Sequence, residues 1–158
     1  MRKKFLVIID DSRELKNAIY FAAKRALNTK GILTMLYVVN PATNAEWARV
    51  SNLIEQEATS DAKKITRKWS FEVEEKFKIK PEIIIRLGNV VDEVIKLIEN
   101  DKEIRFLVLA SSLDNDNPGP IIKSISKRTN HLSVPLIIVP ASLTEKDCLL
   151  YTSPSPRD

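Results

Sequence analysis

The sequence predicts an α/β domain: a doubly wound three-layer sandwich in which a five-stranded parallel sheet lies between two layers of helices. Five short runs are apolar without interruption, which is typical of strands buried on both faces. The segments between them carry apolar residues at helical spacing, so strands and helices alternate along right-handed crossovers. The predicted strands are residues 5–9, 32–39, 82–87, 106–110 and 134–139.

The first crossover is predicted to be a helix. Leu15 and Ile19 stand in an apolar series that recurs at helical intervals. Asp11 with Glu14 forms a capping-box-like start, and Gly31 supplies a stop. We therefore expect one helix between the first two strands.

The second crossover, residues 40–80, predicts a helix of about thirty residues, because apolar side chains including Trp47, Val50 and Trp69 recur at near-helical intervals. Such a helix spans about 45 Å, more than a small domain's width, so we expect an irregular start, a kink or an overhanging end. Its apolar stripe is either internal packing or a groove for an unidentified protein partner, and both readings stay open.

Two shorter helices complete the prediction. Asn89 and Asp92 offer a cap to a helix between residues 88 and 102. Its buried stripe is predicted to include Val91 and Ile95. The last helix is predicted from about residue 121 to 130.

The chain has 158 residues, of which 44% are hydrophobic, enough for one domain with a real core. We expect that domain to occupy residues 1–142 and residues 143–158 to form a disordered tail. From Cys148 the string CLLYTSPSPRD has no strand or helix period and resembles translated adapter sequence. We therefore expect the tail to be partly non-native from residue 148.

Composition excludes several functions. The single cysteine and the single histidine, His131, give neither a disulfide nor a zinc or other metal site. The net charge of +4 comes from dispersed lysines, which does not predict nucleic-acid binding. Near the start the longest wholly apolar run is residues 5–9, too short for a membrane span or secretory segment, so we expect a cytoplasmic protein. With three glycines, neither a P-loop nor a G-x-G-x-x-G motif is present.

The candidate site lies at the carboxyl ends of the strands, where open α/β sheets bind ligands. Asp10, Asp11 and Ser12 follow the first strand, and Ser111 opens the polar segment that follows the fourth. In the strand order 3-2-1-4-5 these two strands are neighbours, so we expect Asp10 and Ser111 to share one cleft. Helix capping by the first group and turn formation at Gly88 are the structural alternatives.

These segments resemble the universal stress protein family. VIIDDS at 7–12 is similar to the V-x-x-D-x-S opening of that family, and LYVVN at 36–40 to its second strand end. RLGNVVDEVI at 86–95 and VPLIIVP at 134–140 follow in the family's order, so the likeness covers residues 4–140. The resemblance implies an adenine nucleotide alpha hydrolase-like, Rossmann-like fold and a homodimer joined through the last strand, burying Leu136 and Ile138.

For nucleotide-binding members, the resemblance implies that Asp10 and Val38 meet the adenosine part and that a glycine-rich loop holds phosphates. ATP or AMP, with magnesium, is then the implied ligand. The phosphate contacts implied in this chain are Ser111, Ser112, Gly119 and Ser124.

The phosphate loop departs from the family pattern, G-x-x-G followed by nine residues and G-[S/T]. Ala110 and Leu113 stand where its first two glycines are expected, and prolines flank Gly119. Proline offers no N–H to a phosphate, and Asp114 and Asp116 repel one. The N-P-G-P run resembles a bacterial branch that carries G-P-G-P before the last helix. We expect adenine-nucleotide binding to be weak or lost.

Two functions from other classes stay open. The first is an ATP-binding universal stress protein acting as a nucleotide-dependent switch. The second is a phosphorelay receiver, which the acidic start FLVIIDDS also resembles, although Leu87 and Pro140 stand near the places of its phospho-accepting aspartate and its lysine. No nucleophile stands beside a base, so we expect no catalytic residue and a non-catalytic stress-response module.

Overall fold

A computed structural model describes residues 2–40, 51–114, 117–144 and 146, and for residues 51–55 the backbone alone. Within them, five parallel strands form one sheet in the predicted order, β3-β2-β1-β4-β5. The strands are β1 (Lys4–Ile8), β2 (Ile32–Val39), β3 (Glu82–Leu87), β4 (Ile104–Ala110) and β5 (Leu136–Val139). The helices are α1 (Leu15–Thr29), α2 (Ser51–Phe77), α3 (Val90–Asn100) and α4 (Pro120–Ser126).

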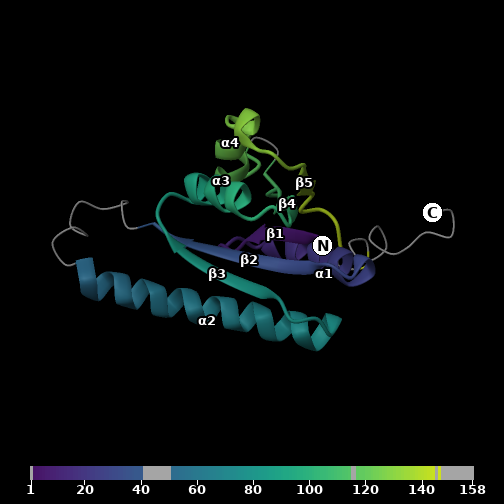
Figure 1. Ribbon diagram of the computed structural model, residues 1–158, viewed down its shortest axis with the longest axis horizontal. Helices are drawn as coiled ribbons and strands as arrows, with labels where there is room; N and C mark the ends of the chain where they lie inside the picture. The colour runs from purple at the N-terminus through teal and green to yellow at the C-terminus, as the bar shows by residue number, and fades with distance from the viewer. Residues whose placement is uncertain (1, 41–50, 115–116, 145, 147–158) are drawn as a thin grey trace.

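Helices cover both faces of the sheet (Figure 1). On one face α1 and α2 pack over a core that includes Phe5, Met35 and Val73, all fully buried. On the other face α3 and α4 enclose a second core around Leu6 and Leu107. The three-layer sandwich is therefore confirmed, and the continuous apolar runs are explained by burial of β1 and β4 on both sides.

The strand order decides against the receiver alternative. Receivers have the flavodoxin-like order 2-1-3-4-5, in which the third strand lies inside the sheet next to the first. Here β3 is an edge strand that pairs only with β2, and β1 pairs with β4. The segment after β3 is thus two strands away from Asp10, so the two cannot form one phosphorylation site.

The start of α1 differs from the predicted capping box. Glu14 is the N-cap residue, it already has a helical backbone, and no side chain caps the first turn. Asp11 is exposed. The helix begins only at Leu15, so Asp11 lies three residues before the N-cap and too far from the first turn to cap it. Just after β1, Asp10 accepts a hydrogen bond from the backbone N–H of Ser12.

The end of α1 also differs. Gly31 was expected to stop the helix, but Lys30 is the residue with the left-handed backbone, at φ 56°. A Cβ atom added at Gly31 would lie 2.5 Å from the carbonyl oxygen of Lys3. Gly31 is therefore required where the chain enters β2 beside the residue that precedes β1.

α2 confirms the long helix of the second crossover, with 27 residues starting at Ser51. Ala62, Val73 and Phe77 are buried, and Trp69 packs against the same core while partly exposed. The predicted stripe residues Trp47 and Val50 lie outside the described residues. For the part that is described, the stripe is internal packing.

The last two helices differ in how well they were predicted. Asn89 caps α3 as expected, accepting a hydrogen bond from the N–H of Asp92 at 3.2 Å. The last helix is shorter than predicted: α4 ends at Ser126 and a separate 3-10 turn spans Thr129–His131. Residues 127–130 carry no apolar side chain to hold a helix on the sheet, and threonine and asparagine are weak helix formers.

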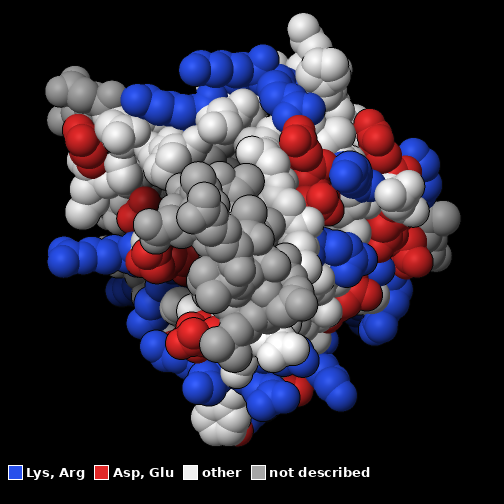
Figure 2. Space-filling model, turned by 90° about the vertical axis from the view of Figure 1, so that its left-hand side faces the viewer, with Lys and Arg blue, Asp and Glu red and all other residues white. Residues whose placement is uncertain are grey.

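Leu143 packs against the α1 side of the core, and residues 145 and 147–158 of the predicted tail lie outside the described residues. None of the described helices is long and apolar enough to cross a membrane. On the face seen in Figure 2, basic and acidic side chains are interspersed.

Candidate functional site

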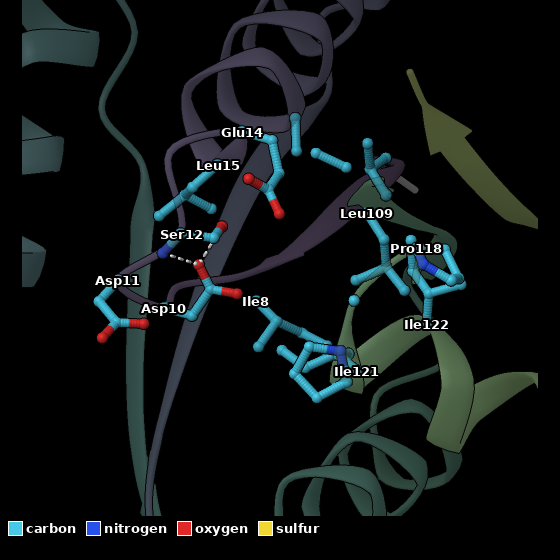
Figure 3. Close-up of a pocket in the computed structure, with 15 residues that line it drawn as sticks. Ile8, Asp10, Asp11, Ser12, Glu14, Leu15, Leu109, Pro118, Ile121 and Ile122 are labelled. Atoms are coloured by element: carbon cyan, nitrogen blue, oxygen red, sulfur yellow. Dashed lines mark hydrogen bonds between the residues drawn. The ribbon is translucent and has the colours of Figure 1, made fainter. Parts of the chain in front are cut away.

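A cleft of about 190 Å³ opens at the carboxyl ends of β1 and β4 (Figure 3). These two strands are adjacent, and the chain winds away from them in opposite directions, which is where open α/β sheets bind ligands. One wall is the β1–α1 connection and the start of α1. The opposite wall is the end of β4 with the start of α4, including Leu109, Pro118, Ile121 and Ile122.

Asp10 is held in place by Ser12. One carboxylate oxygen of Asp10, Oδ1, accepts hydrogen bonds from the backbone N–H of Ser12 at 2.8 Å and from its Oγ at 2.6 Å. The second oxygen points toward the middle of the cleft (Figure 3). The turn therefore fixes one acceptor atom and presents the other to a ligand.

The cleft is acidic. Asp10, Asp11 and Glu14 line it, whereas none of the described residues lining it is Lys, Arg or His. The Glu14 carboxylate points into the space between Ser12 and Leu109 (Figure 3). Two unit negative charges about 4 Å apart repel by roughly 1–4 kcal/mol in surroundings between water and a protein surface. A phosphate placed beside these carboxylates would therefore meet like-charge repulsion.

Backbone N–H groups of the loop after β4 donate hydrogen bonds to acceptors within the protein. The N–H of Ser111 donates to the Val139 carbonyl at 3.0 Å, and the N–H of Ser112 donates to the Pro118 carbonyl at 3.0 Å. The N–H of Gly119 donates to Oδ1 of Asn117 at 3.1 Å. The Ser111 bond continues the pairing of β4 with β5, and an N–H group that already has an acceptor within the protein is not open to a phosphate.

The rest of the described loop is also internally bonded. The N–H of Asp114 donates to Ser112 Oγ at 3.3 Å, and the N–H of Asn117 donates to the Asp114 carbonyl at 3.3 Å. Ser112 Oγ itself donates to the Asn117 carbonyl. Pro118 and Pro120 have no N–H at all. The loop is thus a self-contained turn.

Glycine is required at position 119 because of its backbone conformation, and not because another group packs closely against it. Its φ is 118°, a conformation that residues with a Cβ rarely adopt, yet an added Cβ would meet no atom within 4 Å. The space beside it belongs to the cleft. Glycine therefore lets the chain turn from the loop into α4.

The structure brings two of the six predicted binding residues to the cleft, Asp10 and Gly119. The other four are not among its described lining residues. Ser111 and Ser112 belong to the loop turn described above, and Ser124 is exposed on α4. Val38 packs against the core on the α3 side of the sheet.

Glu14 was not predicted as a cleft residue. The sequence places it at a helix start, where an acidic side chain normally serves as a cap. Glu14 makes no cap hydrogen bond, and its carboxylate faces the cleft instead. A carboxylate four residues after Asp10 was the available signal, but it does not reveal the direction of the side chain.

The nearby cations do not offset this acidity. Arg128, which follows α4, pairs with Asp92 of α3. Lys123 is exposed on α4 and is not among the cleft's lining residues. In the part of the chain that the structure describes, no group of three or more His, Cys, Asp or Glu residues is arranged to hold a metal ion.

Comparisons with known proteins agree with this architecture. The fold is similar to that of the universal stress protein UspA from Lactobacillus plantarum, at 20% identity and a TM-score of 0.72, covering 88% of this chain and 99% of that one. A universal stress protein in complex with cAMP matches at 14% identity and a TM-score of 0.63, covering 89% and 98%. A family member from Arabidopsis thaliana with AMP bound matches at 12% identity and 0.50, covering 87% and 91%.

A search of curated protein sequences gave no match. The sequence model of the universal stress protein family, however, matches residues 1–140, which include every described strand and helix. This chain therefore belongs to the universal stress protein family.

Proposed function

We propose that this chain is a non-catalytic stress-response binding module in which ATP binding is weak or lost. The observation that carries the proposal is the loop after β4, where the N–H groups of Ser111, Ser112 and Gly119 already donate within the protein. A triphosphate would have to break these bonds to gain its own. Each N–H group would exchange one acceptor for another, and a protein acceptor left without its donor costs about 1–3 kcal/mol when it is buried, so the exchange gives little net affinity.

Charge and size support the same proposal. Asp10 and Glu14 place negative charge in the cleft, and no basic side chain is among the described residues that line it. The cleft volume, about 190 Å³, is below the roughly 300–1,000 Å³ that is usual for sites enclosing drug-sized ligands. A ligand that enters it does so with one part, such as a nucleoside, and leaves its charged end outside.

A nucleotide-dependent switch is the second candidate. The solved structures with bound cAMP and AMP favour it, because both ligands carry adenosine and a single phosphate. The second oxygen of Asp10, aimed into the cleft, is suited to accept hydrogen bonds from ribose hydroxyls. If the chain retains a nucleotide, we therefore expect a monophosphate to bind better than ATP.

The absence of catalysis is part of the proposal. Ser12 and Asp10 are the nearest approach to a nucleophile with a base, at 2.6 Å. A carboxylate alone is a weak base for a serine hydroxyl, and activated serines normally use a histidine or lysine. His131 is not among the described residues that line the cleft.

The proposal includes a homodimer joined across β5 in a cytoplasmic protein. β5 is an edge strand with four residues, and Ile138 on it is 45% exposed. Leu136, also in the predicted interface, is half-buried. An uncovered apolar edge favours association with another strand.

Calorimetric titration tests the binding proposal, using MgATP, AMP and cAMP against the full chain. We expect no micromolar ATP binding and, if any nucleotide binds, a preference for the monophosphates. Asn117→Ala removes the acceptor of the Gly119 N–H, so it should strengthen ATP binding several-fold, given about 1 kcal/mol for one hydrogen bond.

Asp10→Asn should weaken any AMP binding, whereas Glu75→Gln, an exposed carboxylate near the C-terminal end of α2, is the control that should not. A micromolar dissociation constant for ATP in the unmodified protein contradicts the proposal. That result would favour the nucleotide-dependent switch over the module with weak or lost ATP binding.

A further inference from the structure

A second hollow, of about 520 Å³, lies beside the cleft and shares Glu14 with it. It is bordered by the start of α1, by Leu113 of the loop after β4 and by the segment that follows β5. Its volume is within the roughly 300–1,000 Å³ that is usual for small-molecule sites. Neither the family's expected binding residues nor the proposed function uses it.

One wall of this hollow is fixed by Asn17. Its side-chain amide nitrogen donates to the carbonyl oxygens of Ala141 at 3.2 Å and Leu143 at 2.9 Å, and makes a longer contact with that of Pro140 at 3.4 Å. The N–H of Leu143 donates to the Pro140 carbonyl at 3.1 Å. The segment after β5 is thus fastened to α1, and the hollow is part of the folded structure.

The apolar part of the lining is aliphatic. Leu113 is 75% exposed, more than any other large hydrophobic residue that the structure describes, and Ala141 and Leu143 belong to the same lining. A single exposed leucine needs no explanation, but one that borders a hollow together with other apolar side chains does. Aromatic side chains are not among the described residues that line the hollow.

The lining of the hollow carries two basic side chains, Arg13 and Lys16. The Nζ of Lys16 lies 5.1 Å from the centre of the Tyr20 ring. The Glu14 carboxylate points toward the cleft instead (Figure 3). Arg13 is exposed, and its fork of N–H donors matches a carboxylate.

We propose that this hollow binds a small amphipathic anion with one carboxylate and an aliphatic body. The carboxylate pairs with the Arg13 guanidinium, and the aliphatic chain covers Leu113 and Leu143. This site is separate from the acidic cleft, so the proposal stands whether or not a nucleotide binds there.

Decanoate is the probe, and decanol, which has the same chain without the charge, is its matched comparison. Titrations followed by amide chemical shifts of the isotope-labelled full chain should show saturable decanoate binding, at least tenfold tighter than decanol binding. The shifted amides should be those of residues 13–17, Leu113 and 141–144. Phenylacetate, an aromatic carboxylate, should bind more weakly than decanoate.

Arg13→Gln should weaken decanoate binding about tenfold, the loss expected for one charge-assisted pair of about 1.4 kcal/mol. Arg86→Gln is the control, because Arg86 is also an exposed arginine but lies on β3. This substitution should leave decanoate binding unchanged. Leu113→Ser alters an exposed side chain without disturbing a buried one and should weaken decanoate and decanol alike. Equal affinity of decanoate and decanol, an Arg13→Gln variant that matches the control, or shifts centred on Asp10 and Gly119 would each overturn the proposal.

Discussion

The Lys4 ammonium lies 2.7 Å from the carboxylate of Asp101. The same ammonium lies 3.2 Å from Glu82, which also accepts a hydrogen bond from the buried Thr34 at 3.1 Å. The Lys4 side chain is 11% exposed and that of Asp101 is 23% exposed. This cluster joins β1, β3 and the turn before β4 at the end of the sheet opposite the cleft, so it stabilises the fold without touching the site.

We expect Lys4→Met to lower the free energy of unfolding by about 1–3 kcal/mol, because it leaves two carboxylates side by side without their shared cation. Urea unfolding followed by circular dichroism measures the change. Lys3→Met is the matched control, since Lys3 is exposed and adjacent in sequence. Equal midpoints for the two variants would show that the cluster contributes nothing.

The pH dependence of this cluster follows from Asp101. Burial alone would raise the pKa of Asp101, but the hydrogen bonds from Lys4 and from the N–H of Glu103, with the Lys4 charge, lower it below its ordinary value. A group with a lowered folded pKa stabilises the protein above its unfolded pKa, about 3.9 for aspartate, and loses that contribution as pH falls through the folded pKa.

Asp101→Asn should therefore be less stable than the unmodified protein at pH 7 and at pH 5 by the same amount, and the difference should shrink below about pH 4. Urea unfolding at these pH values checks it. A difference that stays constant down to pH 2, or that grows on acidification, contradicts the sign of the shift.

Tyr20 gives a second titration test. Burial, and then the hydrogen bond to Glu72 at 2.9 Å and the charge of that carboxylate, raises the pKa of Tyr20 to about 12. Its stabilising contribution is present below the unfolded pKa, about 10, and is lost as pH rises through the folded value. Near-ultraviolet absorbance should show a late tyrosinate step that Tyr20→Phe removes and Glu72→Gln shifts to lower pH. A titration complete by pH 11 would contradict this.

Substitutions at Lys30 and Gly31 should change the free energy of unfolding in opposite directions. Lys30→Gly should raise the free energy of unfolding by about 0.5–1 kcal/mol, because its left-handed backbone is costly for a residue with a Cβ. Gly31→Ala should lower it by about 1–3 kcal/mol, because the new methyl group meets the Lys3 carbonyl. Thermal unfolding of both variants checks the pair, and stabilisation by Gly31→Ala would contradict the geometry.

This pair also illustrates what the sequence could and could not predict. The five strands and both layers of helices followed from apolar runs such as residues 5–9, because burial on two faces leaves a pattern in the residue types themselves. These runs do not reveal which strands are neighbours in the sheet. A glycine after a helix signals a turn, but not which of two neighbours takes the left-handed conformation. That choice depends on how closely the starts of β1 and β2 approach, which is a tertiary property.

For the candidate site, the sequence predicts which residues stand at the strand ends but not how the loop is hydrogen-bonded. The position of Asp10 at the end of β1 follows from the topology, and so does the neighbouring end of β4. The internal bonding of the loop does not, because Ser112, Asn117 and Gly119 pair through the local path of the chain. The sequence shows the prolines, which have no N–H to offer a phosphate. Only the structure shows that the N–H donors of Ser112 and Gly119 are already bonded within the protein.

The proposed dimer gives the last prediction. Ile138 on β5 and Ile83 on β3 are apolar residues at the two edges of the same sheet, 45% and 37% exposed, so each is the other's matched control. A charge in an interface strand must be desolvated on association, so Ile138→Lys should give a monomeric mass by light scattering at tens of micromolar. Ile83→Lys should leave the dimeric mass unchanged. Dissociation by the β3 substitution alone would place the interface at the other edge, and a monomeric unmodified protein would exclude the dimer.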